Sequence, residues 1–334
     1  MIDVGDDLST ALSGMTFIDL FAGIGGFRYA LESFGAECVF SSECDHAAAD
    51  TYEMNHHDRP KGDITKIDAK DIPPMDIVCG GFPCQSFSLN GLQKGFDDKK
   101  HGRLFFEIMR IVRHHHPKVV FLENVKNIAT HDKGRTMKTI RDELAKEGYS
   151  VFDKILNASD FGVPQARERM FILCFRDGND DITSPFPLSA KKEIYLENIL
   201  VTLTPKEAKP FEVDEEVVWK RKDTPKPEMK QIPVGRIKKG RQGERIYHPR
   251  GHAITLSSGG GGLGAKTGLY AVGGKIRRLT PRECARISGF RDDFILHKKP
   301  NQCYKQFGNS VVIDVLQHII KEAIQRGKMG KMPR

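Results

Sequence analysis

The sequence predicts an α/β fold, in which a doubly wound, mixed but mainly parallel sheet is joined to a smaller β-rich domain. In the first 180 residues, short apolar runs alternate with amphipathic patterns, which is typical of βαβ units. Beyond residue 235 the chain becomes rich in glycine and in short strand-like pieces. With 334 residues, of which 39% are hydrophobic, the chain is long enough for more than one domain.

The elements of the first domain follow in chain order. Short apolar runs predict buried strands at 17–20, 38–40, 77–79 and 119–122. Apolar residues at helical spacing predict amphipathic helices between them, at 104–114 and 136–146. A late antiparallel pair is expected at 151–156 and 170–175, and a final amphipathic helix at 311–325 should pack back on this domain.

The second domain is expected at 194–302, and the first is expected to comprise 1–193 together with 303–334. Residues 235–274 form a glycine-dense segment, interrupted by strand-like pieces at 245–247 and 253–256. A flexible linker is the alternative interpretation. The strand-like pieces favour a small β-rich domain whose glycine loops approach a ligand closely.

The positive charge of the chain is concentrated in its C-terminal half. The formal net charge is +8, and residues 226–250 alone carry eight Lys or Arg against two Glu. Such a run is more often a solvated face than a binding site. Here its interleaving with glycine favours a polyanionic partner.

The cysteines and the hydropathy exclude several classes of protein. The seven cysteines are odd in number, scattered and without a C-x-x-C pair, so neither a disulfide framework nor a zinc site is suggested. No run of eighteen apolar residues and no signal peptide is present. We therefore expect a cytoplasmic protein with no metal and no membrane segment.

A glycine-rich turn after the first predicted strand is the candidate cofactor loop. It reads Asp19-Leu-Phe-Ala-Gly-Ile-Gly-Gly26 and opens a helix, whose N-terminus would lie beneath a ligand. It does not match the full dinucleotide fingerprint. Glu43 is placed to bond ribose hydroxyls, and Asp63, at the expected end of a third strand element, is placed to accept from an adenine amino group. A helix cap or a surface charge is the alternative for each acid, but polar groups at successive strand ends favour an adenosine-containing cofactor.

Cys84 is the candidate nucleophile. It follows an apolar run, two glycines and Pro83, a pattern that presents a thiol at the rim of an open sheet, where ligand sites of α/β folds lie. A thiolate at such a rim can act as a nucleophile. The alternative is a small buried hydrophobe, which the polar Gln85 and Ser86 make less favoured.

Three further residues are candidates for catalysis. Glu123 ends the fourth predicted strand beside apolar neighbours, where a carboxyl group can hold a raised pKa and donate or share a proton. Arg167 and Arg169 precede the strand at 170–175 and share one face of extended chain, so they could brace an anion or a carboxylate. A surface ion-pair cluster is the alternative for the arginines.

Taken together, six blocks resemble the DNA (cytosine-5) methyltransferases of bacterial restriction–modification systems, over nearly the whole chain. In chain order the blocks are Phe21–Gly26, Gly81–Gln85, Glu123–Val125, Gln165–Arg169, Arg278–Glu283 and Gln306–Val311. The Hha-type members, which recognise GCGC, look the most similar, and residues 242–247 and 253–257 look like their two recognition loops. The chain departs from that type at two positions: it has Cys44 and Asn90 where the Hha-type enzymes have Trp and Ser.

The resemblance implies a Rossmann-like S-adenosylmethionine-dependent methyltransferase domain with a smaller target-recognition domain. The protein would act on double-stranded DNA as a monomer and protect host DNA from a cognate restriction endonuclease. Cys84 would add to C6 of a flipped cytosine, Glu123 would act at N3, Arg167 would hold the ring intermediate and its neighbours in place, and the methyl group would pass to C5. Arg169 of the same block would belong to the catalytic set.

The resemblance also implies binding residues. Those for the cofactor are Phe21, Gly23, Gly25, Glu43, Asp63, Ile64, Pro83, Leu104, Asn309 and Ser310. Those for DNA are Asn90, Gln242, Arg245, Tyr247 and Thr255. Gln242 would fill the space left by the flipped base, and the paired donors of Arg245 suit a guanine edge.

Two other functions stay open at this point. One is an RNA methyltransferase of the same fold, against which the long basic glycine-rich region argues. The other is a DNA-binding module without catalytic activity, against which the presence of Cys84, Glu123, Arg167 and the cofactor loop argues.

Overall fold

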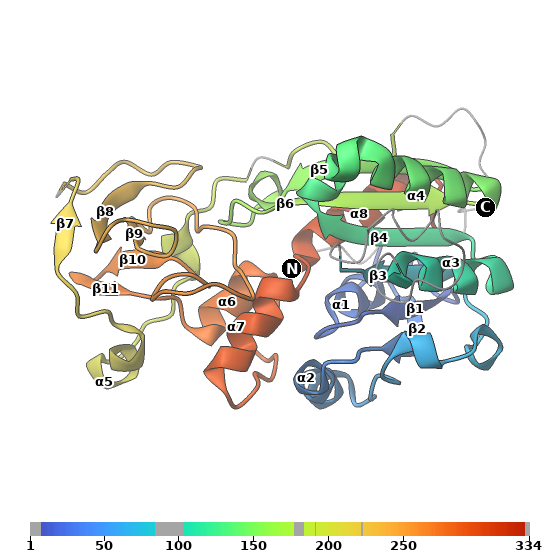
Figure 1. Ribbon diagram of the computed structural model, residues 1–334, viewed down its shortest axis with the longest axis horizontal. Helices are drawn as coiled ribbons and strands as arrows, with labels where there is room; N and C mark the ends of the chain where they lie inside the picture. Colours follow the sequence, from blue (N-terminus) through green and yellow to red (C-terminus); the bar gives the residue numbers. More distant parts are fainter. Residues whose placement is uncertain (1–7, 84–102, 177–183, 191, 222, 331–334) are drawn as a thin grey trace. The chain divides into compact units, whose positions relative to one another are not determined.

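The computed structural model describes residues 8–83, 103–176, 184–190, 192–221 and 223–330. The chain divides into two compact units, each with its own sheet (Figure 1). The six-stranded unit comprises the described residues of 2–156, 168–188 and 316–334, and the five-stranded unit comprises those of 157–167 and 189–315. The domain limits expected from the sequence, 194–302 and the remainder, stay a prediction.

The sheet of the six-stranded unit is mixed and mainly parallel. Its strands are β1 (Thr16–Leu20), β2 (Glu37–Ser42), β3 (Ile77–Gly81), β4 (Val119–Val125), β5 (Ser150–Asn157) and β6 (Glu168–Phe175). They lie in the order β2-β1-β3-β4-β6-β5, which can be followed in Figure 1. The neighbours from β2 to β4 pair in parallel, whereas β4 and β6 are antiparallel. The strands predicted at 17–20, 38–40, 77–79, 119–122, 151–156 and 170–175 and the mainly parallel sheet are therefore confirmed.

Helices cover both faces of this sheet, as the doubly wound prediction requires. They are α1 (Gly26–Glu32), α2 (His46–His56), α3 (Arg103–His115), α4 (Arg135–Lys146) and α8 (Ile313–Gln325). Ile18 and Val120 of the sheet belong to one buried cluster with Ile108 of α3 and Ile140 of α4. On the other face, the ring of Phe27 in α1 lies 5.2 Å from that of Phe121. Gln317 of α8 donates a hydrogen bond to the Ser33 hydroxyl at the end of α1.

Short 3₁₀ helices occur in both units. Those of the six-stranded unit are η1 (Ile64–Lys66), η2 (Ala69–Asp71), η6 (Lys126–Ala129) and η7 (His131–Gly134), and those of the five-stranded unit are η8 (Ala158–Phe161), η9 (Leu196–Ile199) and η10 (Lys209–Phe211). The sequence analysis expected a strand element that ends at Asp63, and this prediction is wrong. Asp63 instead caps η1, and its carboxylate accepts from the Thr65 backbone N–H at 3.0 Å. An Asp that precedes a helical turn is a typical N-cap, so the helix-cap alternative describes this residue.

The five-stranded unit has a small sheet with short strands. They are β7 (Val217–Trp219), β8 (Pro233–Ile237), β9 (Arg245–Tyr247), β10 (Leu269–Val272) and β11 (Lys275–Arg277), in the order β11-β10-β9-β8-β7. Its helices are α5 (Pro205–Ala208), α6 (Pro281–Ile287) and α7 (Pro300–Asn309). Residues 253–256, which were expected to be strand-like, form only an isolated bridge between Ala253 and Gln165.

Candidate active site

The glycine loop of the six-stranded unit follows β1 and has a left-handed backbone at three positions. The φ angle is +55° at Phe21, +57° at Gly23 and +85° at Gly25. Glycine adopts this region without a steric penalty. At Gly25 it is also required by space, because a Cβ there would lie 2.2 Å from His56 Nε2. The loop therefore passes directly over the imidazole of His56.

Glu43 ties this loop to the start of α2. It follows the last residue of β2, and its Oε2 accepts from the Gly23 backbone N–H at 2.8 Å. Its other oxygen accepts from the Asp45 backbone N–H at 2.7 Å. A carboxylate has about four acceptor sites, so Glu43 can still accept hydrogen bonds from ligand hydroxyl groups.

Asp19, on β1, holds the N-terminus of α1. Its side chain is 1% exposed, and burial raises its pKa well above the usual value, against the opposing effect of the Arg28 charge. The backbone N–H of Arg28, the third residue of α1, hydrogen-bonds to this carboxyl group. The N-cap residue, Gly25, has no side chain to do so. Asp19 therefore supplies the missing cap from the strand, a role that the sequence analysis missed although Asp19 opens the glycine motif.

His56 is a second residue that the sequence analysis missed. Its ring centroid lies 4.6 Å from that of Tyr29 and 4.5 Å from that of Tyr52. Burial, together with the charge of Arg28, lowers the pKa of His56 to about 3. The imidazole beneath the glycine loop is therefore neutral at physiological pH. No sequence signal links it to Gly25, because the two residues meet only in the folded chain.

The other expected cofactor residues have varied environments. Phe21 is half-buried against the core cluster, and Ile64 is part of that cluster. Leu104 is half-buried in the first turn of α3, and Pro83, just after β3, is exposed. Asn309 and Ser310 belong to the five-stranded unit, at the end of α7.

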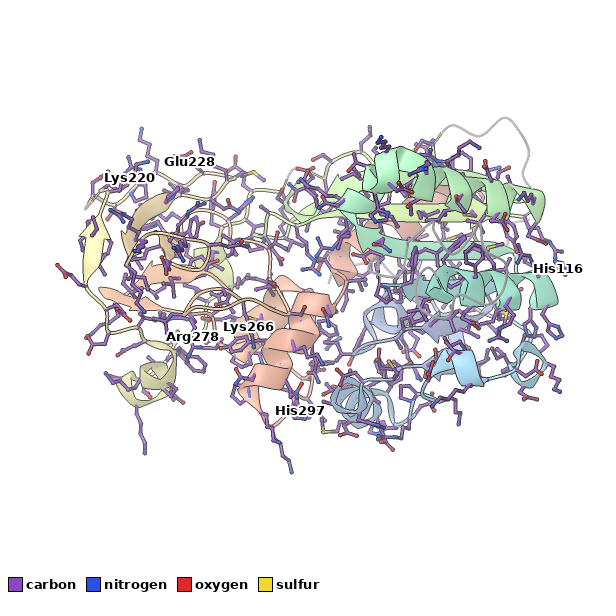
Figure 2. The ribbon with its side chains drawn as sticks, in the orientation of Figure 1. His116, Lys220, Glu228, Lys266, Arg278 and His297 are labelled. Carbon is purple, nitrogen blue, oxygen red and sulfur yellow. The ribbon has the colours of Figure 1, made fainter. Side chains whose placement is uncertain are left out.

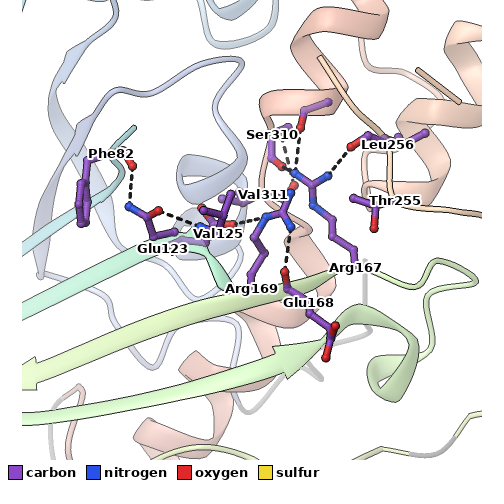
Figure 3. Close-up of polar contacts among 12 residues, drawn as sticks. Phe82, Glu123, Val125, Arg167, Glu168, Arg169, Thr255, Leu256, Ser310 and Val311 are labelled. Carbon is purple, nitrogen blue, oxygen red and sulfur yellow. Dashed lines mark hydrogen bonds and ion pairs between the residues drawn. The ribbon is translucent and has the colours of Figure 1, made fainter. Parts of the chain in front are cut away.

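Glu123, at the end of β4, pairs with Arg169 on the adjacent strand β6. Glu123 is 8% exposed, and Arg169 Nε lies 3.1 Å from its Oε1 (Figure 3). The neighbouring Asn124 donates from its side-chain amide to the Phe82 carbonyl at 2.8 Å. Glu123 also stands in register with Gly81 of β3. The end of β3 that leads toward Cys84 is thus fixed beside the Glu123–Arg169 pair. Cys84 itself, like Asn90, lies outside the described residues.

Arg167 has different partners from those expected. It is 3% exposed, and its Nη1 donates to the Leu256 carbonyl at 3.0 Å. Its Nη2 donates to the carbonyls of Gly308, at 3.1 Å, and Ser310, at 2.5 Å (Figure 3). Of the two arginines expected to brace a carboxylate together, only Arg169 does so. Arg167 instead joins two backbone segments of the five-stranded unit, one at Leu256 and one at 308–310.

The residues expected to read DNA differ in their exposure. Gln242 and Arg245, in and after the β8–β9 loop, are exposed. Thr255 is half-buried, and its hydroxyl donates to the Ala166 carbonyl. Tyr247 is 8% exposed and its ring lies 6.2 Å from that of Tyr270. Because Tyr247 is packed inside the five-stranded unit, we leave it out of the proposed interface.

Several cations of the basic stretch and its surroundings are exposed, including Lys220, which follows β7 (Figure 2). Some have acidic partners: Lys238 lies 2.9 Å from Glu215, and Lys230 lies 2.8 Å from Glu228. In the part of the chain that the structure describes, no group of three or more His, Cys, Asp or Glu side chains could hold a metal ion. No described helix is both long enough and apolar enough to span a bilayer.

Comparison with known proteins identifies the family. Residues 15–325 match the family of C-5 cytosine-specific DNA methylases. The chain belongs to this family. The match covers both the glycine loop and the Glu123–Arg169 pair, so the chain is a DNA (cytosine-5)-methyltransferase, and members of this family use S-adenosylmethionine as methyl donor. The RNA methyltransferase and the non-catalytic module are thereby set aside.

The relatives of this methyltransferase are type II enzymes. It is 49% identical over 320 residues to the type II methyltransferase M.HhaI of Haemophilus parahaemolyticus, with 96% of each chain covered. It is 39% identical to M.HpaII of Haemophilus parainfluenzae, over 95% of this chain and 90% of that one. Among solved structures, the Dnmt2 methyltransferase of S. pombe is similar in fold, with a TM-score of 0.73 at 20% identity, over 93% of this chain and 99% of that one.

Proposed function

We propose that this methyltransferase flips a cytosine out of duplex DNA and methylates it at C5 through a covalent bond to Cys84. The Glu123–Arg169 pair carries the proposal, because a buried carboxyl group braced by a guanidinium stands in register with the strand end that leads to Cys84. A base inside a duplex is out of reach, so extrusion is needed, at a cost of a few kcal/mol.

Cytosine C5 is a weak nucleophile, and the proposed chemistry makes it reactive. The Cys84 thiolate forms a bond to C6, the C5–C6 π electrons move toward C5, and Glu123 provides a proton at N3 to balance the charge that develops on the ring. C5 then gains the methyl group. Loss of the C5 proton to a base, departure of Cys84 and return of the N3 proton to Glu123 restore the aromatic ring, the thiolate and the carboxyl group.

The two arginines of the block at 165–169 receive different roles in this proposal. The Arg169 guanidinium lies against the Glu123 carboxylate. Arg169 therefore braces Glu123 and faces the charge that develops on the cytosine ring. Arg167 keeps the backbone around Leu256 and Ser310 in place, since its Nη1 and Nη2 donate to carbonyl oxygens there. The expectation that Arg167 also holds the ring intermediate stays a prediction.

The residues of the glycine loop fit S-adenosylmethionine, which supplies an electrophilic methyl group when bound. The Glu43 carboxylate has acceptor capacity for ribose hydroxyls, and its bond to the Gly23 N–H keeps the loop backbone in place. The half-buried ring of Phe21 offers a face for adenine. The remaining proposed contacts are Gly25, Asp63, Ile64, Pro83, Leu104, Asn309 and Ser310.

We assign the five-stranded unit to target recognition. The exposed Gln242 and Arg245 suit this role. Gln242 would fill the space that the flipped cytosine leaves in the duplex, and Arg245 would form two hydrogen bonds to a guanine edge. Asn90 and Thr255 are further proposed contacts. Similarity to the Hha-type enzymes supports GCGC as the target and protection from a cognate endonuclease as the role, with the protein acting as a monomer.

Trapping on a modified base tests this proposal. A duplex with 5-fluorocytosine in GCGC blocks the final proton loss, so the protein should remain attached to DNA on a denaturing gel when the cofactor is present. Cys84→Ala should abolish the adduct. Cys44→Ser is the matched control, because Cys44 is an exposed free thiol, and it should leave the adduct intact. Absence of an adduct with the wild-type protein would overturn the covalent route, and bisulfite sequencing of methylated plasmid would report the target.

A further inference from the structure

Arg236 and Arg245 are direct neighbours across the β8–β9 pair of the five-stranded unit. They stand opposite each other in the antiparallel register, and both side chains are exposed. One position further along, the Ile237 N–H donates to the Glu244 carbonyl at 2.9 Å. The Arg236–Arg245 position is therefore of the non-hydrogen-bonded kind, at which opposite side chains approach most closely.

Both arginines lean toward the loop that joins the two strands. Arg236 Nη1 donates to the Lys238 carbonyl at 3.1 Å, and Arg245 Nε donates to the Gly240 carbonyl at 3.3 Å. A Cβ on Gly240 would lie 2.7 Å from Arg236 Cδ, so the aliphatic part of Arg236 packs on that glycine. Lys238 holds a left-handed φ of +46°. The guanidinium of Arg236 is thus held at the base of the loop by its own contacts.

The pair carries positive charge that no acidic side chain neutralises. Like charges directly opposite each other destabilise a sheet, and within the described residues neither arginine forms an ion pair. The nearby Glu244 instead uses its carboxylate on the Arg241 backbone N–H, at 2.8 Å. Glu215 is paired with Lys238. A guanidinium has five N–H donors, and each arginine uses one of them on the loop, so an anion can be bound with the rest.

We propose that Arg236 binds a phosphate group of the DNA backbone, next to the base edge assigned to Arg245. This inference rests on the proposed function, because it takes DNA as the substrate and the β8–β9 loop as part of the interface. The planar fork of arginine suits phosphate oxygens, and a phosphate beside the pair removes the repulsion between the two guanidinium groups. Arg236 then contributes affinity that is independent of sequence, whereas Arg245 contributes discrimination between bases.

Salt-dependent binding distinguishes these two roles. Fluorescence anisotropy would measure binding to two labelled duplexes, one with GCGC and one without it but otherwise identical. The measurements would be made with S-adenosylhomocysteine present, over a series of NaCl concentrations. Arg236→Ala should weaken binding to both duplexes by the same factor and make the slope of log K against log salt less steep by about 0.9, the value for one phosphate contact. Arg245→Ala should weaken binding mainly to the GCGC duplex.

Two further variants control for charge and for loop structure. Arg236→Lys keeps the charge but not the fork, so it should restore the wild-type slope with only part of the affinity. Lys206→Ala removes the same charge from the exposed start of α5, apart from the β8–β9 hairpin in Figure 1, and should bind like wild type. A wild-type slope in Arg236→Ala, or a loss confined to the GCGC duplex, would show that Arg236 only supports the loop and would overturn the inference. If the wild-type protein shows no preference for GCGC, the proposed target fails, while the slope measured on either duplex still decides the role of Arg236.

Discussion

Arg169 Nε lies 3.1 Å from Glu123 Oε1, with the two side chains only 16% and 10% exposed. The antiparallel pairing of β4 with β6 fixes this contact, because Arg169 stands opposite Val125, two residues beyond Glu123 on β4. The pair is therefore built into the sheet, and its geometry does not depend on a loop. In the proposed mechanism, the Glu123 carboxyl group would therefore keep its position while the base enters.

Replacing Arg169 should slow methyl transfer without removing cofactor binding. Arg169→Ala removes a charged donor next to the group that acts on the ring, and loss of one such donor costs roughly 100-fold in rate. Single-turnover transfer of a tritiated methyl group would measure the effect, and Arg169→Lys should recover part of the rate. Calorimetric titration with S-adenosylhomocysteine is the control. A wild-type rate in Arg169→Ala would contradict the role given to this pair.

Arg167→Met should instead lower the free energy of unfolding. The substitution leaves the Leu256, Gly308 and Ser310 carbonyls without their charged donor, and losing such buried bonds costs about 3 kcal/mol or more. Urea denaturation would measure the change. Arg291→Met is the control, because its ion pair with Asp293 is exposed and worth about 1 kcal/mol at most. Equal stability of the two variants would mean that the Arg167 bonds contribute little.

Gly25→Ala should weaken cofactor binding, and Gly148→Ala should not. Both glycines have nearly the same left-handed φ, +85° and +83°, so the backbone strain alone should cost each alanine variant about 1 kcal/mol of stability. Only at Gly25 would the new Cβ meet another group, His56 Nε2. Titration with S-adenosylhomocysteine should therefore separate the two variants. In the double variant, His56→Ala removes the ring that the new Cβ at position 25 would meet, so part of the affinity for S-adenosylhomocysteine should return. If the effects of the two substitutions simply add, the clash between position 25 and His56 is ruled out as the cause.

The neutral His56 should make folding stability depend on pH. Its pKa is about 3 in the folded protein, against 6.5 in the unfolded chain. Between these values only the unfolded chain binds the proton, so the free energy of unfolding rises with pH and the contribution is complete above about pH 6.5. As pH falls below that value, the loss should approach about 1.4 kcal/mol per pH unit.

His56→Phe keeps an aromatic ring between Tyr29 and Tyr52 but does not titrate. Urea denaturation of both proteins from pH 5 to 7.5 should therefore show a shallower dependence for the variant. The difference between the two proteins isolates His56, because the buried Asp19 and the other acids are common to both. Parallel curves would show that the imidazole takes up a proton in the folded state as readily as in the unfolded chain.

The parallel part of the sheet could be predicted from the sequence, whereas part of the site could not. Strands β1, β3 and β4 are buried on both faces, and such strands appear as continuous apolar runs. Arg167 and Arg169 were expected on one face because side chains two apart share a side of a strand. However, β6 begins at Glu168, so Arg167 precedes the strand and the rule does not apply to it. The contact of His56 with Gly25 joins residues far apart in the chain and left no periodic signal.

The cap that Asp19 gives to α1 has a consequence for ligand exchange. Most helices depend on the residue just before their first turn, and any movement of that residue loosens the helix. Here the acceptor is anchored in the central sheet, while residues 21–25 span the gap between strand and helix. A ligand that disturbs residues 21–25 would therefore leave the first turn of α1 intact, because Asp19 holds that turn from the sheet, independently of the loop bond between Glu43 and Gly23.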